Sequence, residues 1–367
     1  MQILIVLGGT GGHIYPGLAL GEKLRSRNNE VILVGKKRGI GEKIARESGF
    51  SFFQIVGEGL VRKFSLKVFR FFAKSIQGFF QSIQIFRSFK PDTVVGMGGY
   101  LSFSVVLAAK ISRITCAIHE PNVLPGLANR VLAKIVDRIM VSFKETEKYF
   151  PSKRTFLTGS PVRQSILSCP RSEGLRKLDL VEGKKNILVF GGSQGARSIN
   201  LAMVKALNFL NPLIKKIQII HIVGIEQFSE IKEEYEKRNY SSRVLPYLLH
   251  MEYAYSCCDL VISRSGASTV AEIIAKGLPS ILIPYPYATR GHQKANAEFL
   301  SKRGGCLLIE DNQLTGELLA DVIIHLIADE AELRGMAENT RRLSIDDTAG
   351  KMADLIEAKG VADLGLR

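Results

Sequence analysis

The amino-acid sequence predicts an α/β protein made of two doubly wound domains, each built on a parallel β-sheet. The same local pattern occurs twice: apolar residues 3–7 run into the glycine-rich segment 8–12, and apolar residues 187–190 run into the glycine-rich segment 191–195. A short β-branched run, a glycine-rich turn and a helix-like pattern are typical of a buried parallel strand that leads into a helix. A chain of 367 residues has room for two domains of roughly 150 to 180 residues.

The first half of the chain contains further strand segments. Strands are predicted at residues 30–34, at the start of 92–100, at 114–118 and at 138–141. Helix-like patterns separate these segments, as in βαβ units. Ligands of open parallel sheets bind beyond the carboxyl ends of the strands. The glycine- and histidine-containing turns that follow these strands should therefore converge on one rim.

The second half repeats this organisation. The charged segment 168–185 is predicted to lead from an interdomain linker into the second sheet, which starts near Asn186. Strands are predicted at residues 217–223, 244–248, 260–263 and 280–284. A helix that starts near Ala267 is expected to end at Gly277, because glycine followed by proline is typical of helix ends.

The composition is that of a folded globular protein. Hydrophobic residues make up 46% of the chain and charged residues 23%, which gives no sign of disorder. No apolar stretch is long enough to span a bilayer, and no secretory signal is expected. The five cysteines show no zinc-ligand spacing and are predicted to be packed side chains of a reducing compartment.

The glycine-rich turns predict a site for a phosphorylated ligand in the cleft between the domains. Backbone N–H groups at a helix start bind anions well, because unpaired donors and the helix dipole point the same way. Neither a dinucleotide fingerprint nor a P-loop is present, since Ile14 occupies the place of the last glycine of a G-x-G-x-x-G motif. The chain has no Asp-x-Asp pair, so a metal-dependent nucleotide-sugar site of that kind lacks its ligands, and no metal or cofactor is expected.

A basic, phenylalanine-rich segment accounts for part of the net charge of +15. No acidic residue occurs between Glu58 and Asp92. One predicted helical stripe faces the core and contains Phe69, Phe72, Ile76, Phe79, Ile83 and Phe86. A second apolar patch, beside lysines, contains Phe64, Phe71, Ile85 and Phe89. Aromatic side chains and lysines together favour contact with an anionic membrane surface, through Phe64, Lys67, Phe71 and Lys74. A helix buried on two sides is the alternative. Nucleic acid is a weaker one, because no recognition motif accompanies the charge.

Several polar residues at predicted strand ends are candidates for catalysis. His13 follows the first glycine loop, and histidine is suited to take a proton from a hydroxyl near neutral pH. Packing or capping is the structural alternative for a single histidine. His119, Glu120 and Asn122 line the same rim, where they form either part of a site or a cluster of structural hydrogen bonds.

Two further charged residues are candidates for ligand binding. Glu272 lies one and a half turns into the helix that starts near Ala267, so its carboxylate is placed to bind a diol while the first amides bind phosphate or sugar hydroxyls. A solvated glutamate is the alternative. Arg163 is suited to bind a diphosphate with two hydrogen bonds, or to form an interdomain salt bridge.

Seven motifs, in order from the first strand to about residue 300, resemble those of the MurG family of bacterial peptidoglycan glycosyltransferases. They are Gly8-Gly9-Thr10-Gly11-Gly12-His13, Gly96-Met97-Gly98-Gly99-Tyr100, His119-Glu120-Pro121-Asn122, Pro161-Val162-Arg163, Gly191-Gly192-Ser193-Gln194-Gly195-Ala196-Arg197, Ser265-Gly266-Ala267 with Glu272, and His292-Gln293 with Asn296. Pro121 and His292 depart from the usual family pattern. The resemblance implies the GT-B fold, with domains at 1–160 and 161–344 and a C-terminal helix at about 345–367 that packs back on the first domain.

The resemblance also implies a reaction. Such enzymes transfer N-acetylglucosamine from UDP-N-acetylglucosamine to the 4-hydroxyl of the N-acetylmuramoyl sugar of lipid I, with inversion, at the cytoplasmic face of the membrane. Carried over residue by residue, the donor site comprises Thr10, Gly11, Gly12, Asn122, Arg163, Ser193, Leu248, Ala267, Ser268, Thr269, Val270, Ala271, Glu272 and Gln293. The acceptor loops comprise Gly98, Gly99, Tyr100 and Asn129, and the catalytic candidates are His13 and Glu120.

Within this donor site, Ser193 and Arg163 are expected to face the diphosphate, Glu272 the ribose, Gln293 the sugar and Leu248 the uracil. Three alternatives remain open: a related transferase with another lipid acceptor such as diacylglycerol, a UDP-sugar 2-epimerase, and a non-enzymatic nucleotide-sugar sensor. The same fold supports all three, so the chemistry of the site has to separate them.

Overall fold

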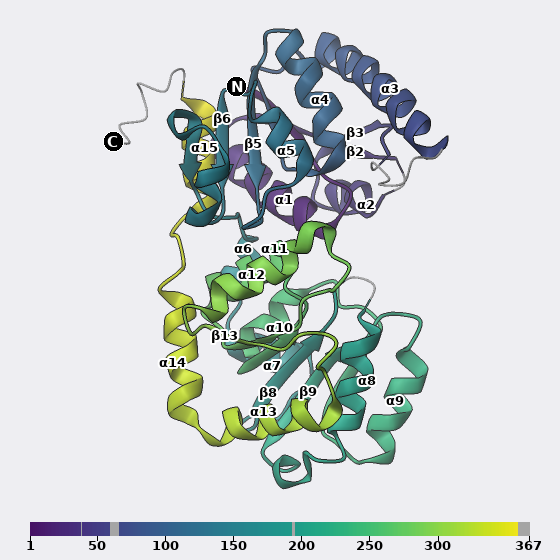
Figure 1. Ribbon diagram of the computed structural model, residues 1–367, viewed down its shortest axis with the longest axis vertical. Coiled ribbons are helices and arrows are strands. Elements are labelled where there is room, and N and C mark those ends of the chain that lie inside the picture. The colour runs from purple at the N-terminus through teal and green to yellow at the C-terminus, as the bar shows by residue number, and fades with distance from the viewer. Residues whose placement is uncertain (38, 59–65, 193–194, 359–367) are drawn as a thin grey trace. The chain divides into compact units, whose positions relative to one another are not determined.

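The structure is a computed structural model that describes residues 1–37, 39–58, 66–192 and 195–358, with the backbone alone at 66–70 and 72. The chain forms two units, and Figure 1 shows a β-sheet with helices in each. Unit 1 runs from Met1 to Arg163 and takes up the chain again from Ile345, and unit 2 is Gln164–Ser344.

The described part of unit 1 contains a parallel sheet of seven strands in the order β3-β2-β1-β4-β5-β6-β7. The strands are β1 Gln2–Val6, β2 Glu30–Lys36, β3 Ser51–Ile55, β4 Thr93–Gly96, β5 Thr115–Glu120, β6 Arg138–Val141 and β7 Thr155–Leu157. The helices are α1 Gly11–Ser26, α2 Ile40–Glu47, α3 Leu66–Phe89, α4 Gly99–Ile111, α5 Leu127–Leu132 and α15 Thr348–Glu357, with short 3-10 helices at Lys144–Tyr149 and Ser152–Arg154.

The described part of unit 2 contains a parallel sheet of six strands in the order β10-β9-β8-β11-β12-β13. The strands are β8 Lys185–Phe190, β9 Ile217–Ile222, β10 Ser242–Leu245, β11 Leu260–Ser263, β12 Ser280–Leu282 and β13 Cys306–Leu308. The helices are α6 Gln164–Ser168, α7 Arg171–Lys177, α8 Arg197–Ala206, α9 Phe228–Lys237, α10 Met251–Cys257, α11 Ala267–Lys276, α12 His292–Ser301, α13 Gly316–Ala328 and α14 Glu330–Arg341, with 3-10 helices at Asn211–Leu213 and Thr289–Gly291.

The predicted fold class is confirmed, and β1 shows why its sequence is apolar throughout. Leu4 and Val6 point into one core cluster, whereas Ile3 and Ile5 point into another on the opposite face of the sheet. All four side chains are completely buried. Successive residues of a strand face opposite sides, so a sheet covered by helices on both faces needs apolar residues at every position.

The predicted strands at 138–141 and 260–263 are confirmed residue for residue. The prediction of a strand at 244–248 is wrong, because β10 ends at Leu245. Pro246 follows, and proline has no N–H for a ladder hydrogen bond. The segment 168–185 was predicted as a connection, but it contains the helix α7.

The predicted stripes of α3 are partly wrong. Ile76 was assigned to the core but is 58% exposed, whereas Ile85 and Phe89 were assigned to a surface patch and are buried. The buried face passes through Gly78, where a Cβ atom would lie 2.6 Å from the carbonyl oxygen of Val56. Small residues let a helix approach its neighbour closely, and a stripe chosen by hydrophobicity alone misses such a face.

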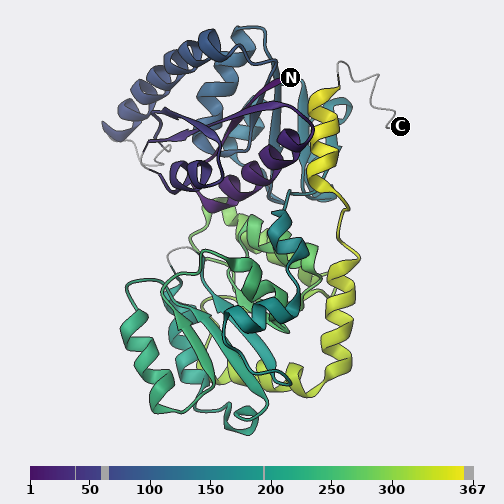
Figure 2. The ribbon, with the colours of Figure 1, turned by 180° about the vertical axis from the view of Figure 1, so that it is seen from behind.

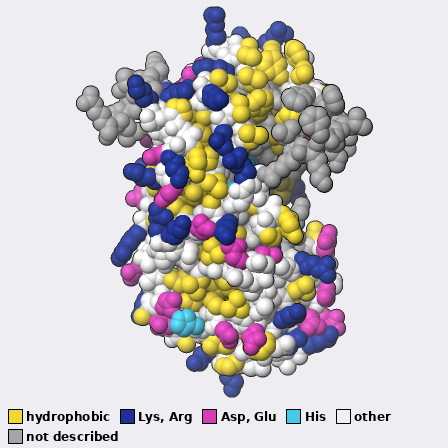
Figure 3. All heavy atoms as spheres, viewed as in Figure 1, with side chains coloured by type: hydrophobic (Ala, Val, Ile, Leu, Met, Phe, Trp, Pro, Cys, Tyr) yellow, Lys and Arg dark blue, Asp and Glu magenta, His cyan; other side chains and the backbone are white. Residues whose placement is uncertain are grey.

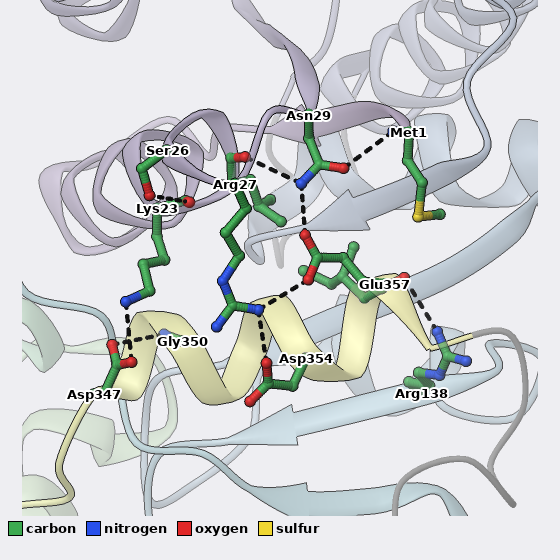
Figure 4. Close-up of polar contacts among 12 residues, drawn as sticks. Met1, Lys23, Ser26, Arg27, Asn29, Arg138, Asp347, Gly350, Asp354 and Glu357 are labelled. Atoms are coloured by element: carbon green, nitrogen blue, oxygen red, sulfur yellow. Dashed lines mark hydrogen bonds and ion pairs between the residues drawn. The ribbon is translucent and has the colours of Figure 1, made fainter.

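The helix α15 belongs to unit 1, where it packs against α1 (Figure 2). Its apolar face is completely buried at Met352, Ala353 and Ile356. Figure 4 shows the polar contacts along it: Arg27 pairs with Asp354 at 2.6 Å and with Glu357 at 2.8 Å. Such exposed ion pairs contribute little, so burial of the apolar face is the main stabilisation of this helix on unit 1.

Arg138 of β6 donates hydrogen bonds to carbonyl groups at the C-terminal end of α15 (Figure 4). Its guanidinium donates to the carbonyl oxygens of Ile356 at 3.4 Å and of Ala358 at 2.5 Å. The last carbonyl groups of a helix have no partner within the helix, and a positive charge also interacts favourably with this end of the helix dipole. Arg138 is therefore buried in the sheet because it caps a helix that arrives from the far end of the sequence.

Candidate active site

The carboxyl ends of β1, β4 and β5 place three predicted motifs along one edge of unit 1. These strands are neighbours in the sheet. The turn after β1 leads into α1 at Gly11, the turn after β4 leads into α4 at Gly99, and β5 ends at Glu120. The structure therefore brings together Thr10, Gly11, Gly12, His13, Gly98, Gly99, Tyr100, Glu120 and Asn122 at one rim.

His13 lies on the first turn of α1, and the glycines of two turns leave room for its ring. A Cβ atom on Gly8 would lie 2.6 Å from the Cβ of His13, and one on Gly98 would lie 2.8 Å from its Cε1. Nδ1 of His13 lies 2.8 Å from the carbonyl oxygen of Met97. A carbonyl oxygen only accepts, so Nδ1 carries the proton in a neutral ring. Nε2 then has the lone pair that a general base needs.

The carboxylate of Glu120 is surrounded by donors. Its Oε1 accepts from the backbone N–H and the side-chain amide of Asn122, at 3.0 and 3.1 Å. Its Oε2 accepts from the N–H of Gly126 and the side-chain amide of Asn129, both at 2.9 Å. Burial raises the pKa of Glu120, and these four hydrogen bonds oppose that shift. The arrangement suits a residue that fixes the loop 121–126.

His119 precedes Glu120 and is completely buried. Its Nε2 lies 3.0 Å from the hydroxyl of Ser142. Burial, with a smaller contribution from the nearby His13, lowers the pKa of His119 to about 3. His119 is therefore neutral at physiological pH and has a structural place in unit 1.

Tyr100 and Arg163 also belong to unit 1. A Cβ atom on Gly9 would lie 3.3 Å from the hydroxyl oxygen of Tyr100, so this ring lies against the first glycine loop. Burial raises the pKa of Tyr100, with a smaller contribution from the charge of Glu58. The guanidinium of Arg163 lies 4.3 Å from the ring centre of Tyr15 on α1, a cation–π contact that holds Arg163 beside this helix.

In unit 2 the carboxyl ends of β8 and β11, which are neighbours, form a second rim. Gly195 has a φ of +78°, and a Cβ atom there would lie 2.1 Å from the carbonyl oxygen of Val223, so only glycine fits this turn. Ser193 lies outside the described residues. The helix α11 starts with Ala267, Ser268 and Thr269, followed by Val270 and Ala271. The first N–H groups of a helix have no acceptor within it and are oriented to bind an anion.

Glu272 is buried on α11, and its Oε2 accepts a hydrogen bond from the hydroxyl of Tyr255 at 2.9 Å. Tyr255, on α10, packs edge to face against Phe190 at the end of β8, with ring centres 6.1 Å apart. Tyr255 therefore fixes the carboxylate that was predicted to bind a ribose. Tyr255 could not be predicted from the sequence, because nothing in the spacing of residues 255 and 272 indicates that they meet.

Gln293, at the start of α12, is held in place from two sides. Its Oε1 accepts from the backbone N–H of Tyr285 at 2.9 Å, and its carbonyl oxygen accepts from the hydroxyl of Ser265 at 2.8 Å. The amide of Asn296 also donates to the carbonyl oxygen of Ser265, at 3.2 Å. These contacts join the starts of α11 and α12. Leu248, predicted near the uracil, follows β10 and is half-buried.

The predicted membrane contacts are described only in part. Phe64 lies outside the described residues, and for Lys67 the backbone alone is described. Phe71 is half-buried, and Lys74 forms an ion pair with Glu58 at 2.6 Å. On the face of unit 1 seen in Figure 3, hydrophobic side chains lie beside lysine and arginine side chains. Among the α3 side chains that the structure describes, the large exposed apolar ones are Ile76 and Phe80, at 58% and 60%.

None of the helices described here is long and apolar enough to cross a membrane. Among the residues with described side chains, no group of three His, Cys, Asp or Glu is placed to hold a metal ion.

Comparison with known proteins agrees with this geometry. Residues 3–141 match the glycosyltransferase family 28 N-terminal domain, and residues 186–354 match the glycosyltransferase family 28 C-terminal domain. A relative from Halothermothrix orenii is 43% identical over 98% of this chain and 100% of its own length. A relative from Thermodesulfovibrio yellowstonii is 44% identical over 88% of this chain and 89% of its own. Both are named UDP-N-acetylglucosamine–N-acetylmuramyl-(pentapeptide) pyrophosphoryl-undecaprenol N-acetylglucosamine transferase.

Solved structures give the same result. The crystal structure of Acinetobacter baumannii MurG has a TM-score of 0.76 and 27% identity, over 97% of this chain and 99% of that one. A UDP-GlcNAc 2-epimerase from Neisseria meningitidis, solved with UDP-GlcNAc bound, has a TM-score of 0.66 but only 15% identity, over 97% and 99% of the two chains. The second likeness concerns the fold alone.

Proposed function

The chain belongs to the MurG family of glycosyltransferases, within glycosyltransferase family 28, and we propose that it makes lipid II in peptidoglycan synthesis. It transfers N-acetylglucosamine from UDP-N-acetylglucosamine to the 4-hydroxyl of the N-acetylmuramoyl sugar of lipid I. The observation that carries this proposal is the full-length similarity to relatives named for this reaction, combined with a His13 ring oriented by the carbonyl oxygen of Met97.

The chemistry starts at the acceptor hydroxyl. Nε2 of His13 takes its proton as the oxygen attacks the anomeric carbon of the donor sugar. Attack from the face opposite to the departing diphosphate inverts the configuration at this carbon. Glu120 acts here as a positioning residue, because its hydrogen bonds hold the loop 121–126 at the same rim.

The departing UDP develops negative charge as the sugar bond breaks. In the proposed donor site, the first N–H groups of α11 and the guanidinium of Arg163 stabilise this charge, and Ser193 is assigned to the same diphosphate. A well-placed donor of this kind is typically worth ~3 kcal/mol in the transition state. Glu272 binds the ribose hydroxyls and Gln293 the sugar, while Leu248 lies near the uracil.

The decisive experiment is incubation of the chain with labelled UDP-N-acetylglucosamine and a short-chain lipid I analogue, with and without added divalent metal. Formation of a disaccharide product in both samples supports the proposal. A parallel reaction with diacylglycerol tests the alternative acceptor, and a reaction without acceptor tests 2-epimerisation of the donor. Product only in either of these parallel reactions would replace the proposed function.

Replacement of Glu272 by alanine should raise the Kd for UDP about tenfold and change turnover less. The reason is the loss of hydrogen bonds to a charged group, which are worth about 1.5–3 kcal/mol. Calorimetry with UDP measures this effect. Tyr255→Phe is the matched variant: it keeps the carboxylate but removes the 2.9 Å hydrogen bond that orients it, so a smaller increase is expected. Unchanged affinity in Glu272→Ala would remove the ribose assignment.

We also propose that unit 1 binds an anionic membrane surface at the cytoplasmic face, where a lipid-linked acceptor is met. The support is the net charge of +15 and the exposure of Ile76 and Phe80 on α3, near the basic stretch that contains Lys67 and Lys74. Exposed aromatic side chains can enter the headgroup region while ammonium groups meet anionic lipid.

Vesicle sedimentation tests the membrane proposal. The double variant Ile76→Glu with Phe80→Glu should bind anionic liposomes at least about tenfold more weakly, since burying each large apolar side chain is worth ~1.5–3 kcal/mol. Ile225→Glu in unit 2 is the control, because Ile225 is 81% exposed but lies on another unit. Equal sedimentation of the double variant and the wild type would refute the assignment of α3 as the contact.

A further inference from the structure

Arg264, the first residue after β11, makes a set of contacts that the proposed reaction does not yet explain. Only 11% of its side chain is exposed. Its Nη1 donates to Oδ1 of Asp311 at 2.5 Å and to the carbonyl oxygens of Ile283 and Pro284, both at 3.2 Å. Its Nη2 donates to the hydroxyl of Ser198 at 2.8 Å, and this hydroxyl donates to Oδ1 of Asp311 at 2.7 Å.

Arg264 and its partners come from four adjacent positions along the carboxyl edge of the unit 2 sheet. Ser198 lies in the first turn of α8, after β8, while Ile283 follows β12 and Asp311 follows β13. The strands β8, β11, β12 and β13 are consecutive in the sheet. One planar guanidinium thus joins the turns after all four strands, which a lysine with a single ammonium group cannot do in the same geometry.

The joined turns carry the residues assigned to the donor. The helix α8 follows the glycine turn 191–196, and α11 starts three residues after Arg264. The ring centre of Tyr285 lies 5.5 Å from the guanidinium, and the backbone N–H of the same tyrosine donates to Oε1 of Gln293. The contacts of Arg264 therefore reach the turns proposed for the diphosphate and the segment proposed for the sugar.

We propose that Arg264, together with Asp311, is a positioning residue that sets the affinity for the nucleotide-sugar donor. This inference rests on the proposed function. Both terminal nitrogens donate to protein oxygens, and Asp311 balances the charge, so Arg264 acts through the turns that it holds. Even a small displacement of these turns weakens every contact that they make with the donor.

The chain offers a matched control at the other end of the same strand. Asp259, directly before β11, pairs with Arg171 at 3.0 Å, and the guanidinium of Arg171 also donates to the carbonyl oxygen of Cys257 at 2.7 Å. This pair has the same composition as Arg264 with Asp311, but it lies at the amino edge of the sheet. Loss of the control pair lowers stability without disturbing the donor rim.

The experiment compares steady-state kinetics of Arg264→Met, Arg264→Lys, Asp311→Asn and Arg171→Met. For Arg264→Met the KM for UDP-N-acetylglucosamine should rise at least about tenfold, with kcat changed much less, as expected when binding contacts are lost. Arg264→Lys and Asp311→Asn should give intermediate increases. Arg171→Met should keep the wild-type KM. In a fifth variant, Arg264→Ala, added guanidinium at millimolar concentration should lower the KM, and it should leave the KM of the wild type unchanged.

Two results would overturn the inference. One is a wild-type KM in Arg264→Met, and the other is an equal rise in Arg264→Met and Arg171→Met, which would indicate a general loss of stability. UDP affinity by calorimetry provides a second readout if a variant turns over too slowly. A wild-type chain that shows neither UDP affinity nor transfer would instead refute the proposed function, and the inference with it.

Discussion

Replacing His13 with alanine should lower turnover by roughly 100-fold or more, because general base catalysis typically contributes 10²–10⁴-fold. The physical reason lies in the tautomer: Nδ1 donates to the carbonyl oxygen of Met97 at 2.8 Å, so the lone pair is on Nε2. The measurement is kcat with saturating donor and a lipid I analogue. The KM for the donor should stay close to the wild-type value, because no donor contact is removed.

His13→Asn separates catalysis from structure. An asparagine amide can donate to the carbonyl oxygen of Met97 as Nδ1 of histidine does, but it has no lone pair of comparable basicity. The asparagine variant should therefore fold as the wild type does and turn over as slowly as the alanine variant. If either variant kept wild-type turnover, the base would have to be sought elsewhere at this rim, beginning with Glu120.

Acidification should destabilise the protein through one buried histidine in each unit. Burial lowers the pKa of His119 in unit 1 and of His221 in unit 2 to about 3. An unfolded chain binds these protons near its ordinary pKa of 6.5, so between pH 6.5 and pH 3 the unfolded state binds more protons than the folded state. The free energy of unfolding therefore has its full value above pH 6.5. Below pH 6.5 it falls with decreasing pH, by about 1.4 kcal/mol per pH unit for each histidine.

Chemical denaturation at pH 7 and pH 5 measures this slope. His221→Gln should remove the contribution of His221 to this slope, whatever effect the substitution has on the free energy of unfolding at pH 7. Tyr235→Phe is the control: it removes the hydroxyl that lies 3.0 Å from Nδ1 of His221 but leaves the histidine buried, so it should lower stability and keep the slope. Equal stability of the wild type at both pH values would contradict the prediction.

The strands could be predicted well where both faces of a sheet are covered. The strands β1, β6, β8 and β11 each contain a run of at least three apolar residues, and a glycine turn after β1 and β8 marks the end of the strand. Three edge strands were not predicted: β3, which has five residues, and β7 and β13, which have three residues each. Three residues are too few for a periodic pattern, and an edge strand is buried on fewer sides.

The positions of the functional motifs could also be predicted, but the role of each residue within them could not. The sequence placed His13 and Glu120 at one rim and left the identity of the base open. The hydrogen bonds bear on this choice, since the carboxylate of Glu120 accepts four of them, whereas Nδ1 of His13 donates to the carbonyl oxygen of Met97. They are the reason why His13 is proposed as the base. Arg264, Asp311 and Tyr255 were not predicted at all, because their partners lie between 17 and 113 residues away in the sequence.

The sequence by itself determined the number of units, the parallel sheets, the glycine turns and the family, because these depend on local composition and on the order of motifs along the chain. Tertiary structure alone decided which side of α3 is buried, which donors surround the carboxylate of Glu120 and which arginine joins the turns after β8, β11, β12 and β13. These properties depend on contacts between distant residues and on how closely two backbones approach. At Gly78 the deciding quantity is the missing Cβ atom, which a hydrophobic pattern does not record.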